Sequence, residues 1–169
     1  MKLRIFKTLS VLTLGLGLAA CSTVSLDDSA TGTGSGASGM GGAAGSGVMD
    51  PFNPSSVLSK NRSVYFEFNS YTVSSQYGDL VSTHARYLTN NPKQKIMIEG
   101  NTDAIGGTEY NLALGNRRAE AVRSNLTLLG AQDAQIETIS FGKEKPKALG
   151  DTEADYAENR RADIVYLRP

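Results

Sequence analysis

A long stretch of small residues, from Ser22 to about Ser59, limits what this chain can fold into. It consists mainly of Gly, Ser, Ala and Thr and shows no periodic apolar pattern. Such a segment cannot bury enough apolar surface to offset the entropy that is lost when it is ordered. We therefore predict a flexible tether over residues 21–60, with a typical end-to-end distance of roughly 31–37 Å. Residues 61–169 are numerous enough for a single domain with its own core.

Residues 1–20 have the pattern of a signal peptide. Three basic residues precede an apolar run and two alanines: Lys2, Arg4 and Lys7, then Leu9–Leu18, then Ala19 and Ala20. The apolar run is about half of the roughly 20 residues that a membrane-spanning helix needs. The alternative is a buried core helix, which the charged start and the glycine-rich stretch that follows make less favourable.

Cys21 is the single cysteine, so an intramolecular disulfide is excluded. It ends the sequence Leu18-Ala19-Ala20-Cys21, which matches the lipobox of bacterial lipoproteins. We expect its thiol to receive a diacylglyceryl group and, after cleavage, its amino group to receive a third acyl chain. Two or three chains anchor a protein almost permanently in lipid, because each buried CH₂ contributes about 0.8 kcal/mol. Ser22, rather than Asp, favours the outer membrane; the alternative for Cys21 is an ordinary small apolar residue.

The charge balance argues against nucleic acid as a partner. The whole chain has 17 Lys+Arg and 17 Asp+Glu. Removal of residues 1–20 takes away three basic and no acidic residues, which leaves 14 basic against 17 acidic. A mildly acidic protein has no long-range attraction to a phosphate backbone.

The domain alternates between strand and helix patterns. The expected order is strand Ser63–Phe68, helix Ser75–Asn91, strand Lys95–Glu99, helix Glu109–Leu129, strand Ile136–Phe141, short helix Glu153–Asn159 and strand Ala162–Leu167. This order, β-α-β-α-β-(short α)-β, predicts an α/β (α+β) two-layer sandwich with the helices packed on one face of a mixed sheet.

A series of spaced motifs gives the domain a recognisable pattern. They are Glu99-Gly100-Asn101-Thr102-Asp103, Gly106, Tyr110-Asn111, Leu114-Gly115, Arg118-Ala119, Gly142-Lys143-Glu144-Lys145-Pro146 and Asn159-Arg160-Arg161. In order and spacing they resemble the OmpA-like peptidoglycan-binding domain family, over about residues 62–168. With the lipobox and the tether, the whole chain is similar to the peptidoglycan-associated lipoproteins of the Tol–Pal envelope system.

Asp103 and Arg118 have the charges that a diaminopimelate ligand requires. The distal centre of diaminopimelate carries an ammonium and a carboxylate, so its site needs a fixed anion and a fixed cation. Arginine suits the carboxylate because its planar fork binds both oxygens. Asn111 lies seven residues before Arg118, and the two therefore share nearly one helix face. The alternative is a structural ion pair between Asp103 and Arg118 that braces the loop against the helix.

The resemblance implies which residues line the diaminopimelate pocket. They are Asp103, Asn111, Leu114 and Arg118, together with Phe68, Asn69 and Arg160. Three of these positions have an alternative role. Asn111 can satisfy backbone groups in the first helical turn, Phe68 can be a core residue, and either Arg160 or its neighbour Arg161 can be a solvated charge.

The resemblance also implies the partners. They are diaminopimelate-containing peptidoglycan, TolB and other Tol proteins, and outer-membrane lipid through acylated Cys21, in a role that supports envelope integrity and cell division. TolB is expected to bind a face that overlaps the wall pocket. Ala104 and Ile105 stand where family members often carry a charged pair, which makes this rim more apolar.

The competing functions are a wall-anchoring lipoprotein without Tol partners, an envelope hydrolase, and a flagellar stator-type protein. The stator type needs a retained transmembrane helix, which the sequence does not predict. A hydrolase needs a nucleophile, a base and an orienting group. Cys21 is expected to be lipidated, and His84 lies on the apolar stripe of its helix, where a packed core residue is expected. No His/Cys spacing suits a metal, so we expect neither catalysis nor a cofactor.

Overall fold

A computed structural model describes residues 49–168. The expected signal peptide, the lipidation at Cys21 and most of the expected tether lie outside the described residues. Among the described residues, no helix is both long enough and apolar enough to cross a membrane.

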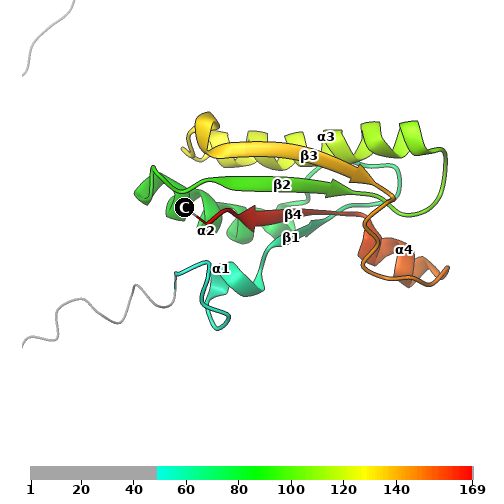
Figure 1. Cartoon of the computed structure of the whole chain (residues 1–169), viewed down its shortest axis with the longest axis horizontal. Coiled ribbons are helices and arrows are strands. Elements are labelled where there is room, and N and C mark those ends of the chain that lie inside the picture. Colours follow the sequence, from blue (N-terminus) through cyan, green and yellow to red (C-terminus); the bar gives the residue numbers. More distant parts are fainter. Residues whose placement is uncertain (1–48, 169) are drawn as a thin grey trace, which may run out of the picture. The chain divides into compact units, whose positions relative to one another are not determined.

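The described residues form a four-stranded mixed sheet with helices packed on one face (Figure 1). In chain order the elements are α1 (Val57–Lys60), β1 (Ser63–Tyr65), η1 (Ser75–Tyr77), α2 (Gly78–Asn90), β2 (Ile96–Asn101), α3 (Thr108–Leu128), η2 (Asp133–Gln135), β3 (Ile136–Gly142), α4 (Glu153–Asn159) and β4 (Arg161–Tyr166). The strand order is β1-β4-β2-β3; β2 and β3 are parallel, and the other two pairs are antiparallel. This confirms the predicted fold class.

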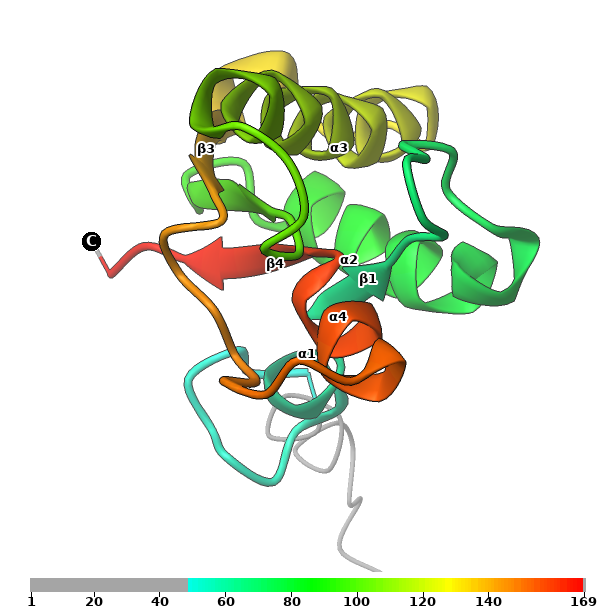
Figure 2. The ribbon, with the colours of Figure 1, turned by 90° about the vertical axis from the view of Figure 1, so that its right-hand side faces the viewer.

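The core lies between the sheet and the pair α2 and α3. Alternate residues of each strand face the helices, as the period of two in a strand requires, and on the helix side the buried residues recur every three or four positions. The cluster contains Val64, Phe66, Val81, Ala85, Leu88, Ile96, Ile98, Ala119, Val122, Leu126, Ala131, Ile136, Ala162, Ile164 and Tyr166. Figure 2 shows α1 and α4 away from α3, beside β1.

Two glycines set the position of α3 on the sheet. A Cβ atom on Gly100 of β2 would lie 1.9 Å from the carbonyl oxygen of Gly115 in α3, and one on Gly115 would lie 2.3 Å from Oγ of Ser140. Only residues without side chains allow this approach of helix backbone to strand backbone. It brings the first turns of α3 against the end of β2, next to the loop that carries Asp103.

The residues before β1 are ordered further upstream than expected. Residues 50–60, which the sequence interpretation placed in the tether, contain α1, and Leu58 and Ser56 are buried. Arg62 donates from Nε to the carbonyl of Leu58 and from Nη2 to that of Pro51. His84 holds the same segment through the carbonyl of Asn61. Scattered apolar residues and main-chain carbonyls hold this segment, and neither leaves a periodic pattern in the sequence.

The expected first strand, Ser63–Phe68, is too long. β1 ends at Tyr65, and the side chain of Phe68 is 59% exposed. The Phe66 amide still bonds to the carbonyl of Arg160, but the chain then turns and reaches Asn69 with φ of 53°. The other elements lie within a few residues of the expected bounds, and α4 has the expected bounds.

Candidate functional site

The predicted site residues gather at one end of the sheet, where β2 ends and β4 begins. The loop 102–107 carries Asp103, the first three turns of α3 carry Asn111, Leu114 and Arg118, and α4 leads into Arg160. The segment 66–71, which follows β1, closes over them. In Figure 1 this end of the sheet is the one next to α4.

Arg118 is completely buried, and backbone carbonyls surround its guanidinium. Nε donates to the carbonyl of Ser70 at 2.9 Å, Nη1 to that of Asn101 at 2.9 Å and Nη2 to that of Glu67 at 3.3 Å. The guanidinium carbon lies 5.2 Å from the centre of the Phe66 ring. Burial lowers the pKa of Arg118 to about 10; the nearby Asp103 opposes this shift and Arg160 adds to it. Arg118 therefore pins the segment 66–70 to the end of β2.

Asp103 forms an ion pair with Arg160 rather than with Arg118. Its Oδ2 lies 3.5 Å from Nη1 of Arg160, and its Oδ1 accepts from the backbone amide of Ile105 at 3.2 Å. Arg160 also donates from Nε to the Phe66 carbonyl and from Nη2 to Glu153, at 3.2 and 2.6 Å. The alternative prediction of a structural ion pair between Asp103 and Arg118 is therefore wrong. Among the described residues, Asp103 pairs with Arg160 instead.

The buried charges of the site do not cancel. Asp103, Arg118 and Arg160 are each no more than 5% exposed, and two of the three are cations. The further acid, Glu153, has a side chain that is 75% exposed, so water screens much of its charge. An excess of buried positive charge favours an anionic group at this place.

Asn111 and Asn69 hold the loops of the site. Asn111 is 1% exposed and donates from Nδ2 to the carbonyl of Ile105 at 3.0 Å, so its amide fixes the loop 102–107. The exposed Asn69 accepts a hydrogen bond from the hydroxyl of Tyr110 and thereby ties the segment 66–71 to α3. Since Phe68 points to solvent, the alternative that it is a core residue is wrong.

A small cleft of about 70 Å³ lies beside these loops. Its lining is Asn69, Tyr71, Tyr110, Ala113, Leu114 and Arg117. Asn69 and Leu114 are predicted site residues, whereas Tyr71, Tyr110 and Arg117 are not. Tyr110, Leu114 and Arg117 are spaced by four and three residues, so the helical period places them on one face of α3. That spacing could have identified them.

Exposed apolar side chains surround the site. Phe68, Tyr71, Ile105 and Tyr110 are between 43% and 59% exposed. They come from the segment 66–71, the loop 102–107 and the first turn of α3. This group, the apolar rim, gives the site a hydrophobic border.

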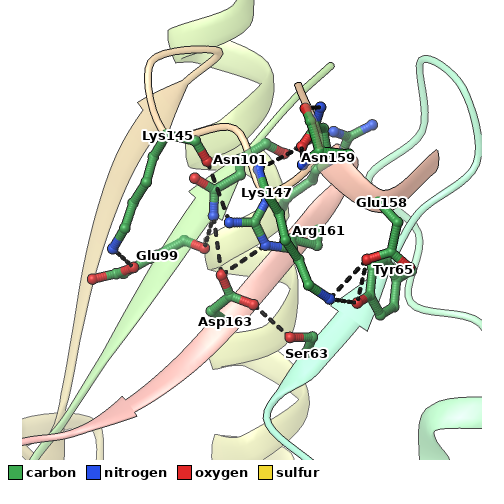
Figure 3. Close-up of polar contacts among 12 residues, drawn as sticks. Ser63, Tyr65, Glu99, Asn101, Lys145, Lys147, Glu158, Asn159, Arg161 and Asp163 are labelled. Carbon is green, nitrogen blue, oxygen red and sulfur yellow. Dashed lines mark hydrogen bonds and ion pairs between the residues drawn. The ribbon is translucent and has the colours of Figure 1, made fainter. Parts of the chain in front are cut away.

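A polar network supports the site on the face of the sheet away from α2 and α3 (Figure 3). Asn101, whose carbonyl accepts from Arg118, donates from Nδ2 to Asp163, and Asp163 pairs with Arg161 at 2.9 Å. Arg161 in turn donates to the carbonyl of Lys145. The network thus fixes the ends of β2 and β4, and with them the positions of Asp103 and Arg160.

The described residues give no arrangement for metal binding. Over residues 49–168, no group of three or more His, Cys, Asp or Glu side chains is placed to hold a metal ion. His84 is 1% exposed and lies between the hydroxyl of Tyr166 and the carbonyl of Asn61, which confirms that it is a core residue.

The comparisons with known proteins agree on one family. The OmpA family matches residues 65–160. The peptidoglycan-associated lipoprotein of Haemophilus influenzae is 40% identical over 152 residues, which cover 88% of this chain and 90% of that protein. That of Pseudomonas aeruginosa is 36% identical, over 94% of this chain and 96% of that protein.

Solved structures extend the likeness to the fold. The crystal structure of the peptidoglycan-associated lipoprotein from Burkholderia pseudomallei matches with a TM-score of 0.67 and 58% identity, and covers 69% of this chain and 98% of that one. The C-terminal domain of Helicobacter pylori MotB matches with a TM-score of 0.58 at 21% identity, over 63% of this chain and 83% of that one, and shares the fold alone. The chain therefore belongs to the OmpA family and, within it, to the peptidoglycan-associated lipoproteins.

Proposed function

We propose that the chain is an outer-membrane lipoprotein that links the membrane to the cell wall without catalysis. Residues 1–20 are removed as a signal peptide, Cys21 receives the acyl chains, and the residues that follow connect the anchor to the domain. The domain binds the diaminopimelate of peptidoglycan stem peptides from the periplasmic side. The sequence of the lipobox supports the anchor, and family membership supports wall binding.

The excess of buried positive charge supports a carboxylate ligand. Arg118 donates one N–H from each guanidinium nitrogen to a carbonyl. Nη1 and Nη2 each carry a second N–H, and this pair can bind both oxygens of a carboxylate. A bound carboxylate would thus pair with Arg118, while Arg160 keeps its ion pairs with Asp103 and Glu153. The observation that carries the proposal is therefore the cluster of two buried arginines and one buried carboxylate.

The ligand ammonium is assigned to Asp103. Phe68, Asn69 and Leu114 would line the sides of the bound group, while Asn111 keeps the loop 102–107 in place. Because the carbonyls of Glu67 and Ser70 cover Arg118, ligand entry requires the segment 66–71 to shift. The exposed Phe68 is the residue of this segment that would then close over the ligand.

Co-sedimentation with purified sacculi tests this assignment. We expect Asp103→Asn to weaken binding by roughly 2–5 kcal/mol, as loss of a partner in a desolvated charge pair does. Arg118→Lys should also weaken it, because lysine keeps the charge but lacks the planar fork that binds both oxygens of a carboxylate. Arg123→Lys is the matched control, because Arg123 lies on the same helix in a surface pair with Asp133. Thermal unfolding of each variant establishes that it is folded. Folded variants that sediment like the wild type would contradict the assignment.

We further propose that the apolar rim binds TolB and that the domain takes part in the Tol–Pal system, in support of envelope integrity and cell division. Exposed aromatic side chains next to a site are typical of protein interfaces. The rim adjoins the wall pocket, so the two partners would exclude each other. Titration with TolB at low and high salt, with and without muropeptide, tests this. We expect a weaker salt dependence than in family members with a charged pair at positions 104 and 105, because Ala104 and Ile105 carry no charge. Muropeptide should compete with TolB, and absence of TolB binding would favour a wall anchor without Tol partners.

A further inference from the structure

A cationic cleft lies at the end of the sheet opposite the candidate site. Four exposed basic side chains, Arg86, Lys93, Lys95 and Arg168, line two adjoining hollows of about 560 and 460 Å³, which share Asn90 and Asn91. One carboxylate, Asp50, is part of the lining. Among the ion pairs of residues 49–168, none includes any of the four basic residues.

The turn that carries two of the lysines is held rigidly. The buried side-chain amide of Gln135 lies 2.9–3.1 Å from the carbonyls of Leu88, Asn91 and Gln94. The side chain of Gln94 donates to the carbonyl of Leu167 at 2.7 Å. The charges of Lys93 and Lys95 are therefore presented from a fixed backbone, which limits the entropy lost when a partner binds.

The chain leaves the domain toward Cys21 at this same end. Met49 and Asp50 line the second hollow, and the guanidinium carbon of Arg168 lies 5.1 Å from the centre of the Phe52 ring. Covalent geometry limits the separation of Cys21 and Met49 to about 100 Å. The six residues of β2 lie between the cationic cleft and the site, a length of roughly 20 Å.

We propose that the cationic cleft rests on anionic phospholipid headgroups of the membrane that holds Cys21. The inference rests on the proposed lipid anchor. It deepens the proposed function, because the opposite end of the sheet, with Asp103 and Arg118, would then face the wall. The charges are complementary, and each basic residue near an anionic surface strengthens binding about fivefold. The acyl anchor supplies a high local concentration, so a weak contact suffices to orient the domain.

Vesicle co-sedimentation of the mature chain without lipid, residues 22–169, tests the proposal. The probes are phosphatidylcholine vesicles with and without phosphatidylglycerol, at low and at high salt. We expect the wild type to bind the anionic vesicles only, and only at low salt. The affinity of Lys93→Gln/Lys95→Gln for these vesicles should be roughly 25-fold lower. Lys143→Gln/Lys147→Gln removes two positive charges at the other end and is the matched control.

Equal losses in both double variants, or equal binding to both kinds of vesicle, would overturn the proposal. Sacculus binding by the same variants separates this inference from the proposed function. Lys93→Gln/Lys95→Gln is expected to sediment with sacculi like the wild type, because its changes lie at the opposite end of the sheet from the site. If this variant keeps wall binding and loses vesicle binding, the inference is supported. If the wild type itself fails to bind sacculi, the result counts against the proposed wall site and leaves the vesicle result unaffected.

Discussion

Protonation of His84 should destabilise the domain as the pH falls from neutral. A carbonyl can only accept a hydrogen bond, so the contact of 2.6 Å with Asn61 places the proton of neutral His84 on Nε2. Nδ1 then accepts from the hydroxyl of Tyr166 at 2.7 Å. A second proton on Nδ1 would reverse this bond, because the Tyr166 hydroxyl would then have to accept, and would place a charge in the core. Burial lowers the pKa of His84 to about 4; the hydrogen bond to Asn61 opposes this shift, and the charge of Arg62 adds to it.

The two pKa values fix the sign and the size of the effect. In the unfolded chain His84 takes up its proton near pH 6.5, and in the folded chain near pH 4. The contribution of neutral His84 to the free energy of unfolding is therefore fully present above pH 6.5 and is lost progressively as the pH falls toward 4. Between pH 7 and pH 5 the free energy of unfolding should fall by about 2 kcal/mol, and by about 3 kcal/mol over the whole range.

Urea unfolding of the mature chain at pH 7, 6 and 5 measures this loss. His84→Gln is the control, because glutamine keeps a donor and an acceptor but does not titrate. The wild type should lose about 2 kcal/mol more than the variant between pH 7 and pH 5. Asp133, Asp155 and Glu158 have pKa values lowered by hydrogen bonds, so their contributions disappear mainly below this window. Equal pH dependence in the two proteins would refute the reasoning.

Three further predictions concern the fold and the anchor. Gly100→Ala should lower the free energy of unfolding by about 3 kcal/mol or more, because its Cβ would lie 1.9 Å from the Gly115 carbonyl oxygen. Gly78→Ala, which has open space around it, is the control in the same denaturation assay. Similar stability of the two variants would be inconsistent with this packing. Arg118→Ala should cost about 3–5 kcal/mol of stability because three carbonyls lose their donor, and a calorimetric loss below about 1 kcal/mol would show that Arg118 does not pin the segment. Cys21→Ser should leave the protein in the soluble fraction or as a precursor, and retention in washed outer membranes would argue against the lipid anchor.

The repeating patterns of the sequence predicted most of the fold. The predictions of α3 from its apolar spacing and of α4 from the helical pattern of Glu153–Asn159 are confirmed. Both depend on local constraints, namely packing against the sheet and helix capping. The first strand was predicted too long because alternation continues through Phe66 to Phe68, although the chain turns after Phe66. The period of a strand cannot show where its neighbour ends.

The contacts of the site were harder to predict than its members. The family resemblance implies Asp103 and Arg118 as site residues, their charges suit the ligand, and they do lie at the same end of the sheet. Arg160 as the ion-pair partner of Asp103 depends on the antiparallel pairing of β4 with β2, which brings together residues 57 positions apart. The burial of Arg118 depends on the carbonyls of the segment 66–70, and main-chain acceptors leave no signal in a sequence.

Binding of two matched stem peptides tests the central claim most directly. One peptide ends in diaminopimelate, and the other has lysine at that position and so lacks the distal carboxylate. Isothermal titration of the mature chain should show at least about 30-fold weaker binding of the lysine peptide, because the buried charge of Arg118 then has no anionic partner. In Arg118→Lys this difference should shrink. Equal affinity of the wild type for the two peptides would contradict the assignment of Arg118 to the ligand carboxylate, and with it the proposed wall site.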